Sequence, residues 1–294
     1  MKVAIFGQYY QNDTRPIIRD IFVFFNANKV DLVIEENFLK ILYEQELLKN
    51  EYQTFNSTKC LDNSFDILIS IGGDGTILRA ATYVKDLGIP ILGINAGRLG
   101  FLAKVQKENI ETFLQLVLEK KYSISKRTLL SLECSPENDQ IQELNFAMNE
   151  VTVSRKDTTS MITIETSLNG EYLNSYWADG LIISTPTGST GYSLSCGGPV
   201  LTPDVKSFVI TPIAPHNLNA RPLVIPDDTE IKLKISGRED QYLVSLDSRI
   251  ASLNNNSVLT IRKTPFEINM VEIPNETFLK TLRAKLLWGE DKRN

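Results

Sequence analysis

Histidine and cysteine are scarce in this chain of 294 residues. His216 is the only histidine, so no metal site built from several histidines can form. The three cysteines, Cys60, Cys134 and Cys196, are an odd number, lie far apart and form no CxxC pair. This spacing favours a reducing compartment over a disulfide framework.

Long apolar runs and basic clusters are missing as well. No apolar run reaches the roughly 18–20 residues of a membrane-spanning helix, and residues 1–7 predict a strand without the apolar core of a signal peptide. The net charge is −5, and lysine and arginine do not cluster as a duplex-binding surface needs. We therefore expect a cytoplasmic protein that binds neither a membrane nor nucleic acid.

The composition is otherwise that of a globular protein, with 42% hydrophobic and 23% charged residues. Over residues 1–122, short apolar runs alternate with helical patterns. The predicted strands are 2–7, 31–34, 66–71 and 89–95, and the predicted helices are 14–27, 36–49, 76–84 and 107–121. This alternation predicts an α/β N-terminal domain with an open, mostly parallel sheet.

Helical periodicity disappears after residue 122, and strand-like runs follow one another as far as residue 273. Asn169-Gly170 lies between two of these runs and is a strong hairpin signal. We expect an all-β C-terminal domain over 123–274. A last helix is predicted over 275–288, with Asn275 as its N-cap, and residues 275–294 are expected to return to the first domain.

The predicted strand 66–71 runs directly into Gly72-Gly73-Asp74-Gly75-Thr76 and then a helix. Glycines let a backbone approach a ligand closely, and helix N-termini bind phosphate. A carboxylate in such a loop repels phosphate unless it serves catalysis or helps to hold a metal ion, so we interpret Asp74 as a proton acceptor or Mg²⁺ ligand. The plain alternative is a glycine turn whose aspartate caps the helix.

Two further segments place polar side chains where a ligand can bind. Residues 95–102, NAGRLGFL, follow a parallel strand at the edge where open α/β sheets bind ligands. There Arg98 could meet a phosphate and Phe101 could line an apolar wall, or Phe101 could be a core residue. Asn149 and Glu150 interrupt an apolar strand and need partners, either the hydroxyls of a ribose or water at a sheet edge.

Residues 179–199 carry the most information. A buried strand opens there into a loop rich in hydroxyls and glycines, which can read an adenine edge while Tyr192 stacks on the ring. The alternative is a linker between strands. His216 is interpreted as a structural hydrogen-bonding residue, because no Gly-x-Ser-x-Gly elbow accompanies it. Asp247 ends a strand and could accept from a ligand or a partner subunit, or could form a turn.

Together these segments resemble the NAD kinase family over about residues 1–288. The matching motifs are GGDGT (72–76), NAGRLGF (95–101), NE (149–150), DGLIISTPTGSTGYSLSCGGP (179–199) and PIAPHNLNARP (212–222). The resemblance implies an α/β domain and an all-β domain with NAD bound between them. It also implies ATP with Mg²⁺ or another divalent cation, and a homodimer or homotetramer.

The family's functional residues carry over as follows. Asp74 is the implied catalytic residue, near the 2′-hydroxyl of the adenosine ribose, in a phosphate loop that includes Gly72, Gly73 and Thr76. The implied NAD-binding residues are Gly75, Arg79, Arg98, Phe101, Asn149, Glu150, Asp179, Thr187, Thr190, Gly191, Tyr192, Ser195, Ala214 and Asp247. Of these, Thr187, Thr190 and Tyr192 are expected near adenine, and Asp179, Ser195 and Ala214 near nicotinamide. The chain departs from the family at Gly191, usually alanine, and at Ser248, usually glycine or histidine.

The expected function is therefore that of an NAD kinase, which transfers phosphate from ATP to the 2′-hydroxyl of the adenosine ribose of NAD and gives NADP. Lipid kinases share the glycine loop and are one alternative, but they need an apolar slot where this chain has Asn149, Glu150 and a polar loop. A dinucleotide sensor without activity is the other alternative, and the presence of Asp74 counts against it.

Overall fold

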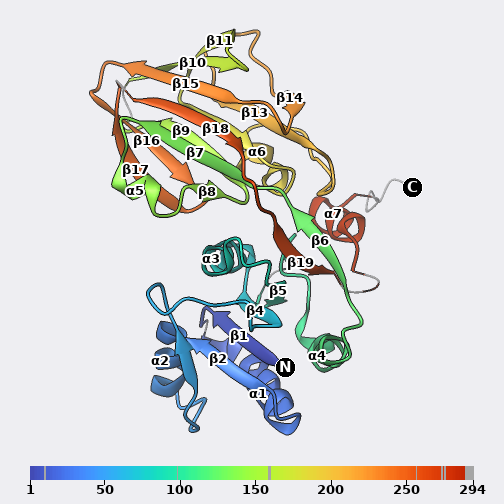
Figure 1. The fold of residues 1–294 in the computed structure, drawn as a ribbon. Helices are drawn as coiled ribbons and strands as arrows, with labels where there is room; N and C mark the ends of the chain where they lie inside the picture. Colours follow the sequence, from blue (N-terminus) through green and yellow to red (C-terminus); the bar gives the residue numbers. More distant parts are fainter. Residues whose placement is uncertain are drawn as a thin grey trace. The chain divides into compact units, whose positions relative to one another are not determined.

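The computed structural model describes residues 1–9, 11–97, 99–157, 160–255, 257–272, 274 and 276–288, with only the backbone of residues 11–13. The chain divides into two compact units, one of Met1–Lys126 with Ile268–Asn294 and the other of Arg127–Glu267 (Figure 1). Within the described residues, no helix combines the length and the apolar character that a bilayer crossing needs.

The first unit is built on a seven-stranded sheet in the order β3-β2-β1-β4-β5-β19-β6. Its strands are β1 (Lys2–Gly7), β2 (Asp31–Glu35), β3 (Gln53–Phe55), β4 (Ile67–Gly72), β5 (Ile91–Asn95), β6 (Ser123–Arg127) and β19 (Ile268–Glu272). From β3 to β19 every neighbouring pair is parallel. Strands β1 and β4 are almost wholly buried, as continuous apolar runs in a covered parallel sheet should be.

Helices cover this sheet. They are α1 (Gln11–Ala27), α2 (Glu36–Glu44), α3 (Asp74–Val84), the 3₁₀ turn η1 (Lys107–Asn109), α4 (Ile110–Leu118) and α7 (Phe278–Leu286). Helix α1 buries Ile17, Ile18, Ile21 and Phe25, which share one helical face, in the core formed with the strands. Helix α7 begins later than the sequence predicts: the Thr277 side chain accepts from the Lys280 N–H and caps it, whereas Asn275 lies outside the described residues.

The second unit consists of two antiparallel six-stranded sheets, ordered β11-β10-β15-β18-β7-β8 and β14-β13-β12-β9-β16-β17. The strands are β7 (Leu130–Ser135), β8 (Phe146–Ala147), β9 (Glu150–Arg155), β10 (Ile162–Leu168), β11 (Glu171–Ala178), β12 (Gly180–Ser184), β13 (Ser207–Ile213), β14 (Leu223–Pro226), β15 (Ile231–Gly237), β16 (Gln241–Leu246), β17 (Arg249–Asn254) and β18 (Val258–Lys263). Short helical turns α5 (Asp139–Gln142), η2 (Gly188–Thr190) and α6 (Tyr192–Ser195) interrupt them. Apolar side chains from both sheets form one core.

The predicted fold class is confirmed: an α/β N-terminal part with a mostly parallel sheet, and antiparallel β sheets in the C-terminal part. The hairpin at Asn169-Gly170 is also as predicted, because Leu168 pairs with Glu171 and both turn residues have positive φ, 51° and 84°. Strand β19 pairs with β5 in the parallel sheet of the first unit, where Figure 1 shows both, and α7 follows it within that unit.

Candidate active site

The glycine bend of the first unit joins β4 to α3. Gly72 has φ of 153°, and a Cβ there would lie 2.3 Å from Thr76 Oγ1, so only glycine fits. The Thr76 hydroxyl donates to Gln8 Oε1 at 2.9 Å and ties the first turn of α3 to the end of β1. At Gly73 and Gly75 an added Cβ would meet nothing within 4 Å, so the outer side of the bend is open.

Asp74 is the first residue of α3, where the partial positive charge of the helix end favours a carboxylate. Its Oδ2 accepts from the N–H of Phe101 at 2.8 Å, and its Oδ1 accepts from those of Leu102 at 3.0 Å and Ala103 at 2.9 Å. An ionised carboxylate has about four acceptor positions. One position, on Oδ2, is therefore left for a further donor.

Gly100 permits this close approach, since a Cβ at that position would lie 2.0 Å from Asp74 Oδ1. The loop that it belongs to is held from its other side by the C-terminal segment of the same unit. The Phe101 and Phe278 rings are 6.0 Å apart, and Lys104 Nζ lies 3.5 Å from Glu272 Oε1. Sequence reasoning did not single out Gly100, although its place directly before Phe101 in the motif was visible.

The remaining candidates of the first unit are Arg79, Arg98 and Phe101. Arg79 is exposed on α3, with its guanidinium carbon 5.9 Å from the centre of the Phe6 ring. Arg98 lies outside the described residues. Phe101 is half-buried against Phe278, as the interpretation of a packed residue expects, while its backbone N–H binds Asp74.

Asn149 and Glu150 lie in the second unit where the chain leaves β8 of one sheet and enters β9 of the other. Strand β9 is flanked by β12 and β16, so the interpretation of a water-facing sheet edge is wrong. Within the described part of the chain, Asn149 Oδ1 and Glu150 Oε2 are buried and have no hydrogen-bond partner. An unsatisfied buried acceptor costs about 1–3 kcal/mol. Two of them side by side indicate that a ligand supplies the donors.

The Glu150 carboxyl is electrostatically unusual. Its pKa is raised to about 8, first by burial and then by the nearby Asp247, while the Tyr192 backbone N–H acts in the opposite direction. In the absence of a ligand the group is therefore largely protonated at neutral pH. Donors from a bound ligand would favour the ionised form.

The loop after β12 packs directly on Asn149. The Thr185 N–H donates to the Asn149 carbonyl at 2.9 Å, and the Thr185 hydroxyl donates to that of Met148 at 2.6 Å. Gly188 lies so close that a Cβ would be 2.1 Å from the Asn149 carbonyl oxygen. A Cβ at Gly191 would lie 3.3 Å from Glu150 Oε2. The loop thus stands next to the backbone of Asn149 and to the unsatisfied Glu150 Oε2.

Other predicted residues surround the same place. Tyr192 is 46% exposed, and its pKa is raised first by burial and then by Cys196, Asp179 and Glu150. Thr190 donates to the carbonyl of the buried Thr187 at 3.2 Å. Ser195 is exposed at the end of α6.

Asp179 and Ala214 lie at the paired ends of β12 and β13, since the Asp179 N–H donates to the Ile213 carbonyl at 3.0 Å. Asp179 Oδ2 lies 3.0 Å from Arg155 Nη2, an ion pair that sequence reasoning missed. Ala214 is exposed and has φ of 43°.

The backbone N–H of His216 donates to the Trp177 carbonyl at 2.8 Å, and the centres of the two rings are 5.6 Å apart.

Asp247 turns its side chain inward, with 5% of it exposed, and accepts from the backbone N–H groups of Met148, Asn149 and Glu150. Burial raises its pKa, whereas these three N–H groups and Arg249 favour the ionised form. Arg249 was not predicted; it donates to the carbonyl oxygens of Leu144 and Phe146.

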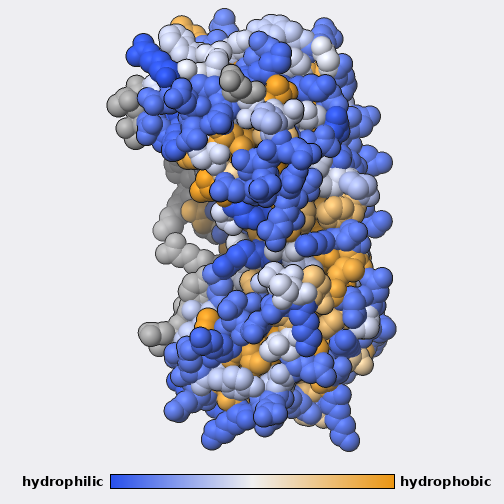
Figure 2. Space-filling model, turned by 60° about the vertical axis from the view of Figure 1, so that its left-hand side comes forward, coloured by the Kyte–Doolittle hydropathy of each residue, from blue (hydrophilic) through white to orange (hydrophobic). Residues whose placement is uncertain are grey.

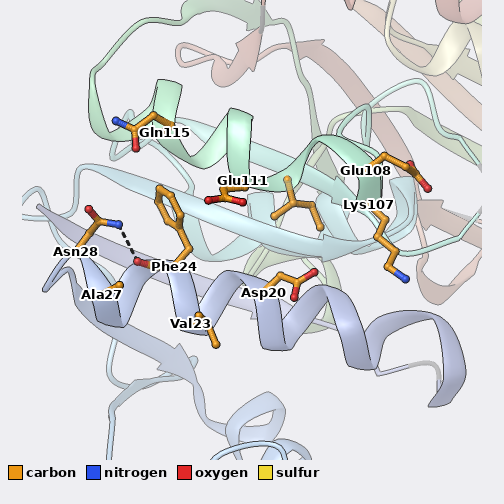
Figure 3. Close-up of a pocket in the computed structure, with 10 residues that line it drawn as sticks. Asp20, Val23, Phe24, Ala27, Asn28, Lys107, Glu108, Glu111 and Gln115 are labelled. Carbon is orange, nitrogen blue, oxygen red and sulfur yellow. Dashed lines mark hydrogen bonds between the residues drawn. The ribbon is translucent and has the colours of Figure 1, made fainter.

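A separate groove of about 580 Å³ lies between α1 and α4 on the first unit. Figure 3 shows Phe24 of α1 pointing toward α4, which carries Glu111 and Gln115 on the facing side. No predicted site residue lines this groove. The face in Figure 2 is mostly hydrophilic with scattered apolar patches, as a chain with 23% charged residues should be. Among the described residues, no three His, Cys, Asp or Glu side chains gather as a metal site.

Comparisons with known proteins agree over the whole chain. Residues 4–122 match the family model described as ATP-NAD kinase N-terminal domain, and residues 148–273 match that of the ATP-NAD kinase C-terminal domain. The chain is 76% identical to the NAD kinase of Flavobacterium johnsoniae and 56% identical to that of Christiangramia forsetii, in both cases over all of both chains.

Two solved structures are also similar. A yeast NADH kinase complexed with NADH has a TM-score of 0.87 at 22% identity, covering all of this chain and 89% of that one, and shows the fold. An NAD kinase from Archaeoglobus fulgidus in complex with ATP has a TM-score of 0.74 at 26% identity, covering 98% of this chain and 99% of that one.

A carboxylate fixed in a glycine bend at a helix N-terminus is suited to activating a hydroxyl while phosphate arrives at the same helix end, and this chemistry defines a phosphotransferase with an alcohol acceptor. The family models and the relatives of high identity make the assignment specific: the chain belongs to the ATP-NAD kinase family.

Proposed function

We propose that the protein transfers the γ-phosphoryl group of ATP to the 2′-hydroxyl of the adenosine ribose of NAD and releases NADP and ADP. The observation that carries this proposal is the Asp74 carboxylate, which three backbone N–H groups hold in place with one acceptor position remaining. The names of the solved neighbours, which describe complexes with NADH and with ATP, support both substrates.

In this reaction the ribose hydroxyl donates its hydrogen bond to Asp74 Oδ2. As the new O–P bond forms and the bond between the γ-phosphorus and the ADP oxygen breaks, the hydroxyl proton passes to Asp74. General base catalysis of this kind contributes about 10²–10⁴-fold to the rate. Because the loop 101–103 fixes the carboxylate beforehand, little reorganisation is needed during the transfer.

NAD supplies the donors that the second unit lacks. Ribose hydroxyls of NAD donate to Asn149 Oδ1 and Glu150 Oε2, the buried atoms without partners. The family resemblance assigns Thr187, Thr190, Gly191 and Tyr192 to adenine, and Asp179, Ser195 and Ala214 to the nicotinamide end. It assigns Gly75, Arg79, Arg98 and Phe101 to NAD as well, with Gly72, Gly73 and Thr76 in the phosphate loop. We propose these roles for the present chain.

A divalent cation, Mg²⁺ or another, accompanies ATP in this proposal. Mg²⁺ usually takes one or two carboxylates together with phosphate oxygens and water. Asp74 has one acceptor position left, which the ribose hydroxyl takes, so phosphate oxygens and water supply the ligands of the cation in this proposal. When bound, the cation neutralises charge on the phosphates. We also propose a homodimer or homotetramer, which sedimentation of the purified protein would test.

A panel of acceptors and donors, with each product identified by mass, tests the function. NADP should form from NAD and ATP, and the phosphate should be on the 2′-oxygen. Phosphorylated diacylglycerol in place of NADP would favour the lipid kinase alternative. NAD binding without any phosphorylated product would favour the sensor.

A further inference from the structure

At Met148 and Asn149 the chain crosses from one sheet of the second unit to the other. Strand β8 ends at Ala147 in one sheet and β9 begins at Glu150 in the other, so these two residues belong to neither hydrogen-bond ladder. Buried backbone N–H groups that leave a ladder need another acceptor. Asp247 is that acceptor, although it is 97–99 residues away in the sequence.

Within the described residues, the Asp247 carboxylate accepts its hydrogen bonds from the backbone at this crossing between the sheets. Its Oδ2 accepts from the Met148 N–H at 3.0 Å, and its Oδ1 accepts from those of Asn149 at 2.8 Å and Glu150 at 3.2 Å. In return, the Asp247 N–H donates to the Glu150 carbonyl at 3.0 Å. The one remaining acceptor position is on Oδ2, the oxygen that lies 4.0 Å from Arg249 Nη2. Since 5% of the side chain is exposed, a substrate has little of it to contact.

The backbone conformation of Asp247 also indicates that its side chain is needed at this position. Asp247 and Ser248 form the two-residue loop between β16 and β17, and Leu246 pairs with Arg249 across it. Asp247 has φ of 52°, a conformation that glycine adopts more readily at the first position of such a loop. An aspartate in this place has a conformational disadvantage that its three hydrogen bonds offset.

We infer that Asp247 is a positioning residue: it fixes the backbone of residues 148–150 so that Asn149 and Glu150 present their acceptors to NAD, and it does not contact NAD itself. This differs from the NAD-binding role that the sequence resemblance implies for Asp247, and it rests on the proposed function. The Thr185 N–H and the close packing of Gly188 hold the Asn149 carbonyl on the opposite side. The side chains of residues 149 and 150 thus project from a backbone fixed at both its N–H and its C=O groups.

Asp247→Gly tests the inference, because glycine tolerates the positive φ and only the carboxylate is lost. We expect the dissociation constant and the KM for NAD to rise at least tenfold, with the KM for ATP changed less than twofold. Asp247→Asn keeps an acceptor for the Asn149 and Glu150 N–H groups and should stay within about fivefold of the unaltered protein. Ser248→Gly, at the exposed second position of the same loop, is the matched control and should bind NAD normally.

A double-mutant cycle separates positioning from contact. In a protein that already carries Asn149→Ala and Glu150→Ala, Asp247→Gly should weaken NAD binding less than threefold further. If the full tenfold loss appears again in that background, or if Asp247→Asn is as damaging as Asp247→Gly, Asp247 contacts NAD and the inference is wrong.

Crystal structures of the ligand-free protein and of Asp247→Gly give a readout that does not depend on the reaction. Displacement of the 148–150 backbone in the variant supports positioning, and an unmoved backbone overturns it. If the unaltered protein makes no NADP from NAD and ATP, the proposed function fails, whereas the positioning of residues 148–150 is still decided by these structures.

Discussion

Two aspartates, one in each unit, hold their surroundings in the same way. Asp74 accepts from the N–H groups of residues 101–103 and Asp247 from those of residues 148–150; in both, one carboxylate oxygen takes two donors and the other takes one. The two aspartates differ in the surroundings of the one acceptor position that remains on each carboxylate. Asp74 is flanked by glycines with open space around them, whereas Asp247 is almost fully buried beside Arg249.

The same arrangement of hydrogen bonds around a carboxylate can therefore serve two different functions. A carboxylate with three fixed donors keeps about one acceptor position. Where that position can be reached, the carboxylate can meet a substrate hydroxyl; where it faces an arginine, the carboxylate can only hold its neighbours. The comparison therefore predicts that substituting Asp74 in the first unit strongly lowers turnover, whereas substitutions in the second unit weaken the binding of NAD.

The largest effect is expected for Asp74→Asn. The amide cannot accept the hydroxyl proton, so kcat should fall about 10²–10⁴-fold, while the dissociation constant for NAD changes little. Steady-state turnover and calorimetric binding measure the two effects, and thermal unfolding checks that the fold persists. Near-normal turnover in this variant would remove the base role and, with it, the distinction between the two aspartates.

A smaller effect, on binding alone, is expected for Glu150→Ala. The variant removes a buried acceptor that we assign to NAD, and it should weaken NAD binding by about 1.5–3 kcal/mol, the usual scale for hydrogen bonds to a charged group. Thermal unfolding is measured alongside, because the variant also removes the contact of the Glu150 carboxyl with the Tyr192 backbone N–H. Calorimetry with NAD gives the result, and an unchanged dissociation constant would exclude Glu150 from the site.

Gly100→Ala tests how closely Asp74 must be held. The new methyl would lie 2.0 Å from Asp74 Oδ1, so the loop or the carboxylate must shift. Such overpacking lowers the stability of the protein by about 1–3 kcal/mol. Turnover (kcat) should fall as well, because the carboxylate is displaced. Gly97→Ala is the matched control, since a Cβ there meets nothing within 4 Å. Equal thermal midpoints and equal turnover in the two variants would show that Asp74 does not depend on the close approach of Gly100.

Much of this site was predictable from local sequence. A buried strand running into Gly-Gly-Asp-Gly-Thr indicates a bend with a functional carboxylate, and polar residues within an apolar strand indicate acceptors that need partners. The contacts that fix these groups were not predictable: Asp74 reaches donors 27–29 residues away, and Asp247 reaches donors 97–99 residues away. Periodicity reports only on near neighbours in the sequence.

The same limit explains two differences between the predicted and the observed fold. Residues 268–272, which lie within the predicted all-β domain of 123–274, form an apolar run that would suit either a parallel or an antiparallel sheet, and only pairing with β5 places it in the first unit. Likewise, Thr277 and Asn275 are both good N-cap residues, and the structure selects Thr277 because its side chain meets the Lys280 N–H.

The smallest expected effect concerns pH and the two carboxyl groups of the second unit. The pKa of Glu150 is raised from 4.5 to about 8 in the folded protein, first by burial and then by Asp247. The folded state therefore keeps a proton that the unfolded state releases, and this contribution to stability is present below about pH 4.5 and is lost as the pH rises toward 8.

Glu150→Gln removes this ionisation while keeping the shape of the side chain. At pH 5 the two proteins should unfold at similar temperatures, whereas at pH 8.5 the variant should be more stable by about 1–2 kcal/mol, less than the full shift would give because the side chain is partly exposed. Thermal unfolding between pH 5 and pH 9 measures the difference. A difference that stays constant with pH would mean that Glu150 is already ionised in the folded protein. The contrast between Asp74, which lies beside open glycines, and the buried carboxyl pair of the second unit would then lose its electrostatic basis.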